Sequence, residues 1–165
     1  DELFGRLQVI GAAGVALMHG AQDGQKFMST AMVAIALAAN MGVSDVGGFP
    51  LWIEVLCAGV MALGTAVGGK KIIKTVGMSM VQLDKYQGFA ASISATASLL
   101  VATLTGLPVS TTHTKTAAIM GAGAAENVRS VNWAIAKDMV LTWVFTFPGC
   151  GLIGYLLARL FLVLF

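Results

Sequence analysis

The segment 51–68, "LWIEVLCAGVMALGTAVG", most limits what this chain can fold into. Glu54 is its one charged residue, and as a helix it would nearly cross the hydrocarbon core, which is about 30 Å thick, at about 1.5 Å per residue. Only 11% of the chain is charged, against roughly 25% in ordinary soluble domains. The mean hydropathy is +0.83. We therefore predict an all-α integral membrane protein, with residues 1–165 forming a single membrane domain.

The distribution of basic residues predicts an orientation in the membrane. Residues 69–86 contain Lys70, Lys71, Lys74 and Lys85, and short cytoplasmic segments carry such an excess of Lys and Arg. We therefore expect residues 69–86 to be cytoplasmic and the protein to lie in the cell (inner or plasma) membrane as a multi-pass protein. The net charge of +2 gives no indication of a nucleic-acid partner.

Two further apolar regions are each interrupted by a polar stretch. Residues 5–40 are broken by "HGAQDGQK", and residues 87–125 are broken by "GLPVSTTHTK". Short apolar runs around a Gly-flanked polar break are typical of discontinuous helices at membrane depth. We expect two such broken or re-entrant half-helix pairs. Residues 134–165 are long enough for a terminal span, which Pro148 is expected to kink or divide.

The polar breaks would be costly unless they served a purpose. Each unsatisfied backbone group in hydrocarbon costs several kcal/mol, and an Asp at the centre of a span costs about 2.5–3.5 kcal/mol on insertion scales. Asp23 is therefore a candidate functional residue, paired with a cation or a base. An N-cap role for the following half-helix is compatible with this.

The second break has the features of an anion site. Pro108 suits the entry to a helix, and Ser110, Thr111 and Thr112 would place hydroxyl groups beside its free backbone N–H groups. The positive end of a helix dipole favours an oxyanion there. A second half-helix starting after Asp23 would add another positive end, and the two together could hold a tetrahedral oxyanion. Plain capping and helix–helix hydrogen bonding are the alternative for these hydroxyl groups.

The residues at both breaks resemble the signatures of a known family. "HGAQDGQKF" (19–27) is similar to the Gly-Ala-Asn-Asp signature of the inorganic phosphate transporter family. "PVSTTHTKTAAIMGAG" (108–123) resembles its second signature, and "LDKYQGFAAS" (83–92) resembles the stretch before that span. Members are carriers that move phosphate with sodium ions or protons, and they are built from two inverted repeats. The resemblance therefore implies one inverted-repeat half, similar to the C-terminal repeat of bacterial members.

The resemblance also implies roles for individual residues. Asp23 matches the acidic residue that couples a cation, so it would bind Na⁺ if the carrier is sodium-coupled. No further cofactor is expected. Gln22 stands where the family usually has Asn, and Ser92 stands where many members carry an acid, which leaves the coupling ion open. The phosphate site is expected to comprise Gln22, Gln25, Ser110, Thr111, Thr112 and His113.

Several residues keep two interpretations. Lys26 and Lys115 could lie near phosphate or pair with an acid, and His19 could be a packing partner. His113 could be a proton relay, a phosphate neighbour or a hydrogen-bonding residue between helices. Cys57 and Cys150 lie in apolar runs, which favours buried unpaired thiols over a disulfide or metal pair.

Three classes of function follow from these patterns. A secondary carrier is favoured, and a passive anion channel or structural membrane subunit is the alternative. A membrane hydrolase using Ser110 and His113 is disfavoured because the sequence has no Gly-flanked nucleophile elbow, so we do not expect an enzyme. The chain begins "DELFGRL" without Met, which suggests a piece of a longer polypeptide. The expected partners are inorganic phosphate, Na⁺ or H⁺, lipid and the other repeat half, with a homodimer left open.

Overall fold

The computed structural model describes residues 2–42, 44, 47–48, 50–74 and 79–164. In these residues the chain is built from helices joined by loops, and no strand is present. The elements in chain order are α1 (Glu2–Ala38), α2 (Leu51–Lys74), α3 (Lys85–Leu104), α4 (Thr111–Glu126), the 3-10 helix η2 (Val128–Ser130) and α5 (Trp133–Leu164).

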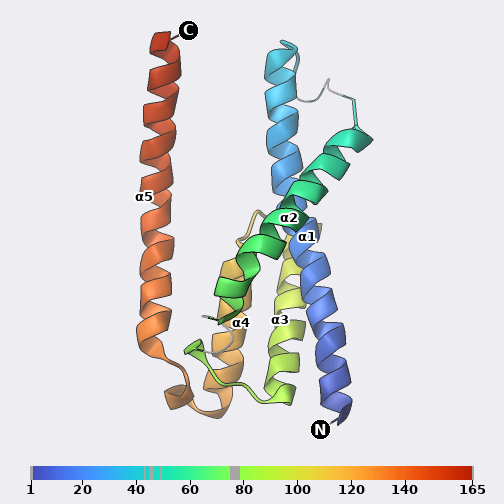
Figure 1. The fold of residues 1–165 in the computed structure, drawn as a ribbon, viewed down its shortest axis with the longest axis vertical. Coiled ribbons are helices and arrows are strands. Elements are labelled where there is room, and N and C mark those ends of the chain that lie inside the picture. Colours follow the sequence, from blue (N-terminus) through green and yellow to red (C-terminus); the bar gives the residue numbers. More distant parts are fainter. Residues whose placement is uncertain (1, 43, 45–46, 49, 75–78, 165) are drawn as a thin grey trace.

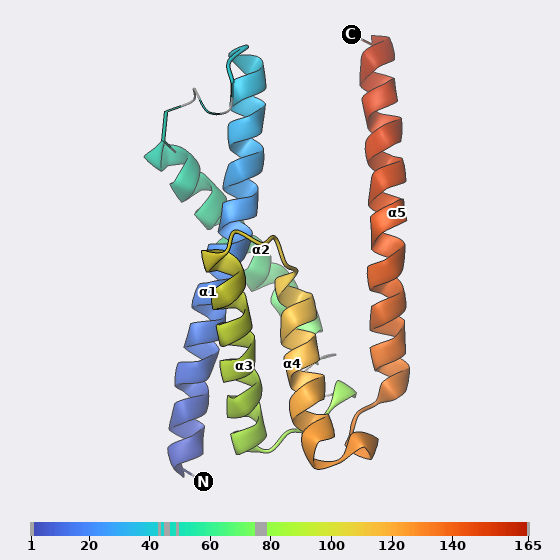
Figure 2. The ribbon, with the colours of Figure 1, turned by 180° about the vertical axis from the view of Figure 1, so that it is seen from behind.

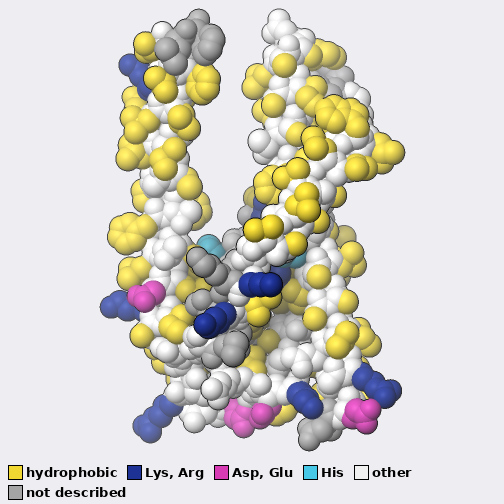
Figure 3. Space-filling model, in the orientation of Figure 1, with side chains coloured by type: hydrophobic (Ala, Val, Ile, Leu, Met, Phe, Trp, Pro, Cys, Tyr) yellow, Lys and Arg dark blue, Asp and Glu magenta, His cyan; other side chains and the backbone are white. Residues whose placement is uncertain are grey.

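Four of these helices are long and apolar enough to cross a membrane. By length and composition they are α1, α3, the segment Leu51–Lys70 of α2 and the segment Trp133–Val163 of α5. Hydrophobic side chains cover much of the visible surface of α2 and α5, and most of the visible charged side chains lie in the lower half of the molecule (Figure 3). This agrees with the predicted all-α membrane protein.

Helix α1 packs against α3 through very small residues (Figure 1). A Cβ atom at Gly11 would lie 3.0 Å from the Cβ of Ser92, and one at Gly14 would lie 3.3 Å from the side chain of Thr96. Glycine therefore lets the two backbones approach this closely, as small residues do in membrane helix pairs. The Ala-, Ser- and Thr-rich part of α3 thus packs closely against α1.

Helices α3 and α4 form an antiparallel hairpin, and its loop carries the second polar break. Thr105 and Gly106 form a turn after α3, and helical structure resumes at Thr111. Helical structure is therefore interrupted at residues 105–110. Figure 2 shows that the loop between α3 and α4 lies beside the middle of α1, far from either end of that helix.

The expected interruption of the first region is not present, because α1 is one continuous helix across residues 19–26. The polar side chains there reach partners on the α3–α4 loop, so the backbone keeps its own hydrogen bonds. A glycine in a helix costs only about 1 kcal/mol relative to alanine, less than several unsatisfied backbone groups in an apolar medium. Gly20 and Gly24 are therefore tolerated within α1, and the prediction of an unwound middle is wrong.

Helix α5 stands apart from the others for most of its length (Figures 1 and 2). It is continuous through Pro148, so it is not divided there. Its N-terminal end is held by Val131, which is buried with Met80 and Val81, and by a ring contact between Trp143 and His113. The apolar face of the rest of α5 is exposed in this chain.

Two smaller expectations have mixed outcomes. Cys57 and Cys150 are both unpaired as expected, but Cys57 is only partly buried and Cys150 is exposed. Helix α2 extends through Lys74, so the first part of the predicted basic segment 69–86 is helical. Residues 75–78 of that segment lie outside the described residues.

Candidate functional site

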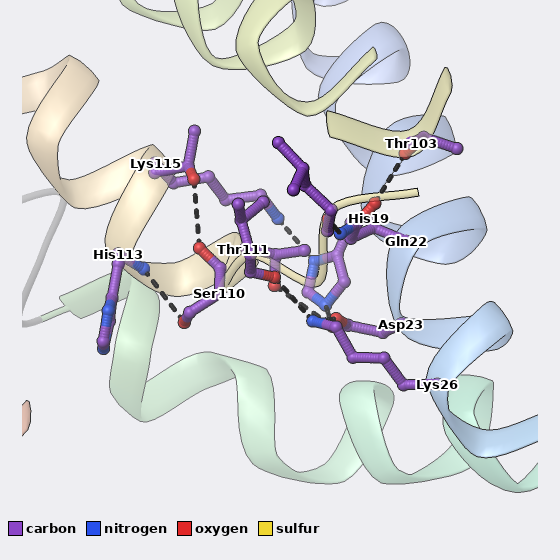
Figure 4. Close-up of polar contacts among 12 residues, drawn as sticks. His19, Gln22, Asp23, Lys26, Thr103, Ser110, Thr111, His113 and Lys115 are labelled. Carbon is purple, nitrogen blue, oxygen red and sulfur yellow. Dashed lines mark hydrogen bonds and ion pairs between the residues drawn. The ribbon is translucent and has the colours of Figure 1, made fainter. Parts of the chain in front are cut away.

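Gln22 joins the middle of α1 to the α3–α4 hairpin. Its side-chain amide donates to the carbonyl oxygen of Leu107 at 2.8 Å, and its side-chain oxygen accepts from the hydroxyl of Thr103 at 2.7 Å (Figure 4). The residue is 2% exposed. A buried amide with both ends satisfied stabilises a unique arrangement, because either partner left alone would carry a desolvation penalty.

The carboxylate of Asp23 is the centre of a polar cluster. Its Oδ2 atom accepts from the hydroxyl of Thr111 at 3.1 Å and lies 2.9 Å from Nε2 of His19. Its Oδ1 atom lies 2.9 Å from the ammonium nitrogen of Lys26. His19 and Lys26 flank Asp23 at i−4 and i+3, the spacing that places side chains on one face of a helix.

Two lysines extend this cluster. The ammonium group of Lys26 also donates to the carbonyl oxygen of Val109 at 2.6 Å. The ammonium group of Lys115, from α4, contacts Nδ1 of His19. An ammonium group can only donate, so Nδ1 accepts and Nε2 carries the proton directed at Asp23. Lys115, His19 and Asp23 thus form a chain of hydrogen bonds from α4 to α1.

The charges of this cluster do not cancel. Asp23 supplies one negative charge and the ammonium groups of Lys26 and Lys115 supply two positive charges, while His19 lies between Asp23 and Lys115. An anion would therefore be attracted to the cluster, and the attraction is strongest where little water separates the charges.

The start of α4 carries the hydroxyl residues of the second signature. Ser110 is the N-cap, and its hydroxyl accepts from the backbone N–H of His113 at 3.4 Å. Thr111 is buried and turned toward Asp23, while Thr112 is exposed. The ring of His113 lies against the ring of Trp143 on α5, with centroids 4.0 Å apart and planes inclined by 31°.

The structure brings together part of the predicted site. Asp23 and Thr111 meet directly, Ser110 precedes Thr111 at the N-cap of α4, and Gln22 bonds to the end of α3 and the loop after it (Figure 4). Gln25 is exposed on α1, but it lines a groove of about 570 Å³ with Gln22, Lys26, Ser29, Thr103 and Gly106. The side chain of His113 points away from Asp23 in Figure 4.

Sequence reasoning did not select every residue of the cluster. Thr103 was not among the predicted site residues, and nothing in its local sequence, "LLVATLTG", distinguishes it from Thr105. His19 and Lys26 carried a usable signal in their helical spacing from Asp23. Within the described part of the chain, no group of three or more His, Cys, Asp and Glu side chains could hold a metal ion.

The fold and the cluster together define a multi-pass helical membrane protein with a polar site at the middle of its first helix. The sequence profile described as the Phosphate transporter family matches residues 1–154. The chain therefore belongs to the phosphate transporter family, as its two signatures predicted.

Curated relatives agree with this assignment. The chain is 40% identical over 154 residues to a Bacillus subtilis protein named "Probable low-affinity inorganic phosphate transporter". It is 39% identical over 156 residues to a Rhizobium meliloti protein and 38% identical over 152 residues to a Mycobacterium tuberculosis protein, both of the same name. These matches cover 93%, 94% and 92% of this chain, but only 46%, 46% and 36% of the relatives. The chain thus spans less than half the length of these relatives. No solved structure matches it.

Proposed function

We propose that this chain is one half of a secondary active carrier that moves inorganic phosphate together with Na⁺ or H⁺ across the cell membrane. The observation that carries the proposal is the meeting of the two signatures. The Asp23 carboxylate of the first accepts a hydrogen bond from the Thr111 hydroxyl of the second, beside the buried bridge from Gln22 to Leu107. The printed names of the relatives support phosphate as the substrate.

In this proposal the α3–α4 hairpin is a re-entrant pair of half-helices whose loop lies at membrane depth. The position of that loop beside the middle of α1 supports this assignment (Figure 2). Loop backbone at that depth needs internal partners, and the side chains of Gln22 and Lys26 satisfy the carbonyl groups of Leu107 and Val109.

The proposed phosphate site uses the start of α4. Backbone N–H groups and hydroxyl groups at a helix N-terminus favour oxyanions, and Ser110, Thr111 and Thr112 stand there. Gln22, Gln25 and His113 complete the proposed set. Asp23 holds the coupling cation, which is Na⁺ or H⁺.

The proposed partner is the other, inverted repeat of the same carrier. The matches to less than half of each relative and the exposed apolar faces of α2 and α5 support a missing half. The second half would cover these faces and complete the site. A homodimer of such carriers is compatible with this arrangement.

A passive anion channel or a structural membrane subunit is the alternative from another class. The cluster around Asp23 favours the carrier, because a pore for anions gains nothing from a carboxylate at its centre. The contacts of His113 give no support to a hydrolase, since its backbone N–H, and not its ring, bonds to Ser110.

The test uses the complete protein that contains this chain, reconstituted in liposomes. Uptake of radiolabelled phosphate is followed with an inward Na⁺ gradient, with an inward proton gradient and with neither. We expect uptake that requires one of the two gradients and falls to background in Asp23→Asn. The matched control is Asp138→Asn, which removes an exposed carboxylate on α5. Uptake indifferent to both gradients and to Asp23→Asn would refute the coupling and favour a channel.

A further inference from the structure

The ammonium group of Lys26 occupies a position with the ligands of a small cation. It lies 2.9 Å from Oδ1 of Asp23 and 2.6 Å from the carbonyl oxygen of Val109. A carboxylate oxygen and a backbone carbonyl oxygen are typical ligands of hard metal cations. The ammonium group of Lys26 therefore places a positive charge between two oxygens of the kind that coordinate cations.

The other carboxylate oxygen of Asp23 is already occupied. Thr111 donates to Oδ2, and Nε2 of His19 lies 2.9 Å from the same atom. A free cation that binds at Asp23 must therefore displace a donor, and Lys26 is the donor whose removal opens both Oδ1 and the carbonyl group of Val109. Lys115 adds a further positive charge through His19, so a free cation and both lysines repel one another.

A place for the displaced ammonium group lies next to it. Lys26 also lines the groove that holds the polar side chains of Gln22, Gln25, Ser29 and Thr103. Its side chain is 39% exposed. Because a lysine stem is also long and flexible, the ammonium group can turn from Asp23 into this groove. An ammonium group there would add a positive charge beside Gln22 and Gln25, which belong to the proposed phosphate site.

We propose that Lys26 is a tethered cation that competes with the coupling Na⁺ for Asp23 and binds phosphate when it is displaced. This deepens the function proposed above and rests on it. Without Na⁺, the charge of Lys26 is neutralised by Asp23, and phosphate binds weakly. With Na⁺ at Asp23, the freed ammonium group faces the groove and phosphate binds tightly. The competition thus makes binding of the two substrates mutually dependent, as thermodynamic linkage requires.

The test measures equilibrium binding of ²²Na⁺ and of radiolabelled phosphate to the purified complete protein. In the wild type, each substrate should raise the affinity for the other. In Lys26→Met, which keeps the stem but loses the charge, ²²Na⁺ should bind without phosphate roughly tenfold more tightly. Phosphate should bind more weakly and with no response to Na⁺. Lys26→Arg should keep the linkage, and Lys137→Met, on the exposed surface of α5, should behave as the wild type.

A second variant approaches the same contact from the other side. Asp23→Asn releases Lys26 permanently, so phosphate should bind with an affinity that no longer depends on Na⁺. Phosphate uptake by the same variant is expected to be at background. The inference is overturned if Lys26→Met leaves Na⁺ affinity unchanged or lower, or if Asp23→Asn retains Na⁺-dependent phosphate binding. A wild-type protein that neither binds nor takes up phosphate would instead refute the proposed function.

Discussion

The hydroxyl of Thr111 donates a hydrogen bond to the carboxylate of Asp23 at 3.1 Å, although 88 positions separate the two residues. The contact joins the start of α4 to the middle of α1. It links the residue proposed to bind a cation with the helix N-terminus proposed to bind phosphate. The two proposed ligands would therefore lie within one connected group of side chains.

Removing this hydroxyl should weaken the proposed site. Thr111→Val keeps the shape of the side chain, but it removes a hydrogen bond to a charged group, which is worth about 1.5–3 kcal/mol. We expect the KM of phosphate uptake by the complete protein to rise about tenfold or more. Thr111→Ser retains the donor and should restore most of the affinity. Equal KM values for Thr111→Val and the wild type would show that the contact has no part in substrate binding.

Gln22 should be important for stability. In Gln22→Leu the carbonyl oxygen of Leu107 and the hydroxyl of Thr103 lose their partner in a buried place. We expect a loss of about 1–3 kcal/mol in the free energy of unfolding. Thermal unfolding of the purified protein in detergent would measure it. Gln25→Leu, at an exposed position of the same helix, is the matched control and should change the midpoint little; equal midpoints for both variants would contradict this role.

Two glycines of α4 should respond differently to the same substitution. A Cβ atom at Gly123 would lie 2.5 Å from Cγ1 of Val81, which is itself buried. Gly123→Ala should therefore destabilise the protein by about 1–3 kcal/mol through overpacking. At Gly121 nothing lies within 4 Å, so Gly121→Ala should be neutral or stabilising by up to about 1 kcal/mol.

The same unfolding measurement compares the two alanine variants. A lower midpoint for Gly123→Ala beside an unchanged or higher one for Gly121→Ala is the expected result. If both variants shifted in the same direction by the same amount, the close approach of α4 to Val81 would be refuted.

Gly106 is required by the backbone of the α3–α4 loop. Its φ of +70° lies in the left-handed region, where a side chain costs roughly 1–2 kcal/mol. Gly106→Ala should lower the midpoint of thermal unfolding, and Gly106→Asn should lower it less, because Asn tolerates this region better. An Ala variant that unfolds at the same temperature as the Asn variant would contradict the assigned loop conformation.

The sequence predicts the helices and the second break well, because both depend on local chemistry. The length of the apolar run 51–68 suits a span, and Pro108 with the hydroxyl residues after it marks a helix start that the structure places at Thr111. These signals lie within a few residues of the feature that they determine.

The first break could not be judged in the same way. The polar residues 19–26 lower the hydropathy, but hydropathy does not report whether the backbone is interrupted. The outcome depends on Leu107, Val109 and Thr103, which lie more than 80 positions away and satisfy Gln22 and Lys26. With those partners in place, the backbone of α1 stays helical, and the polar stretch 19–26 differs from the rest of the helix only in its side chains.

The cluster of charges likewise has one part set by nearby residues and one part set by residues far away in the sequence. The spacing of His19, Asp23 and Lys26 on one helix is visible in the sequence. The contact of Lys115 with His19 spans 96 positions and depends on how α4 packs against α1. The stacking of His113 on Trp143 likewise depends on the position of α5, so neither the sequence motif nor its spacing could assign it.

The most direct test of the account is phosphate counterflow by the complete protein in liposomes. The vesicles are loaded with unlabelled phosphate and diluted, with equal Na⁺ and pH on both sides, into a trace of radiolabelled phosphate. A carrier whose site alternates between the two sides should exchange the two and accumulate label transiently above its equilibrium level. A monotonic approach to equilibrium, unaffected by the unlabelled phosphate inside, would mean an open path through the membrane and would contradict the carrier.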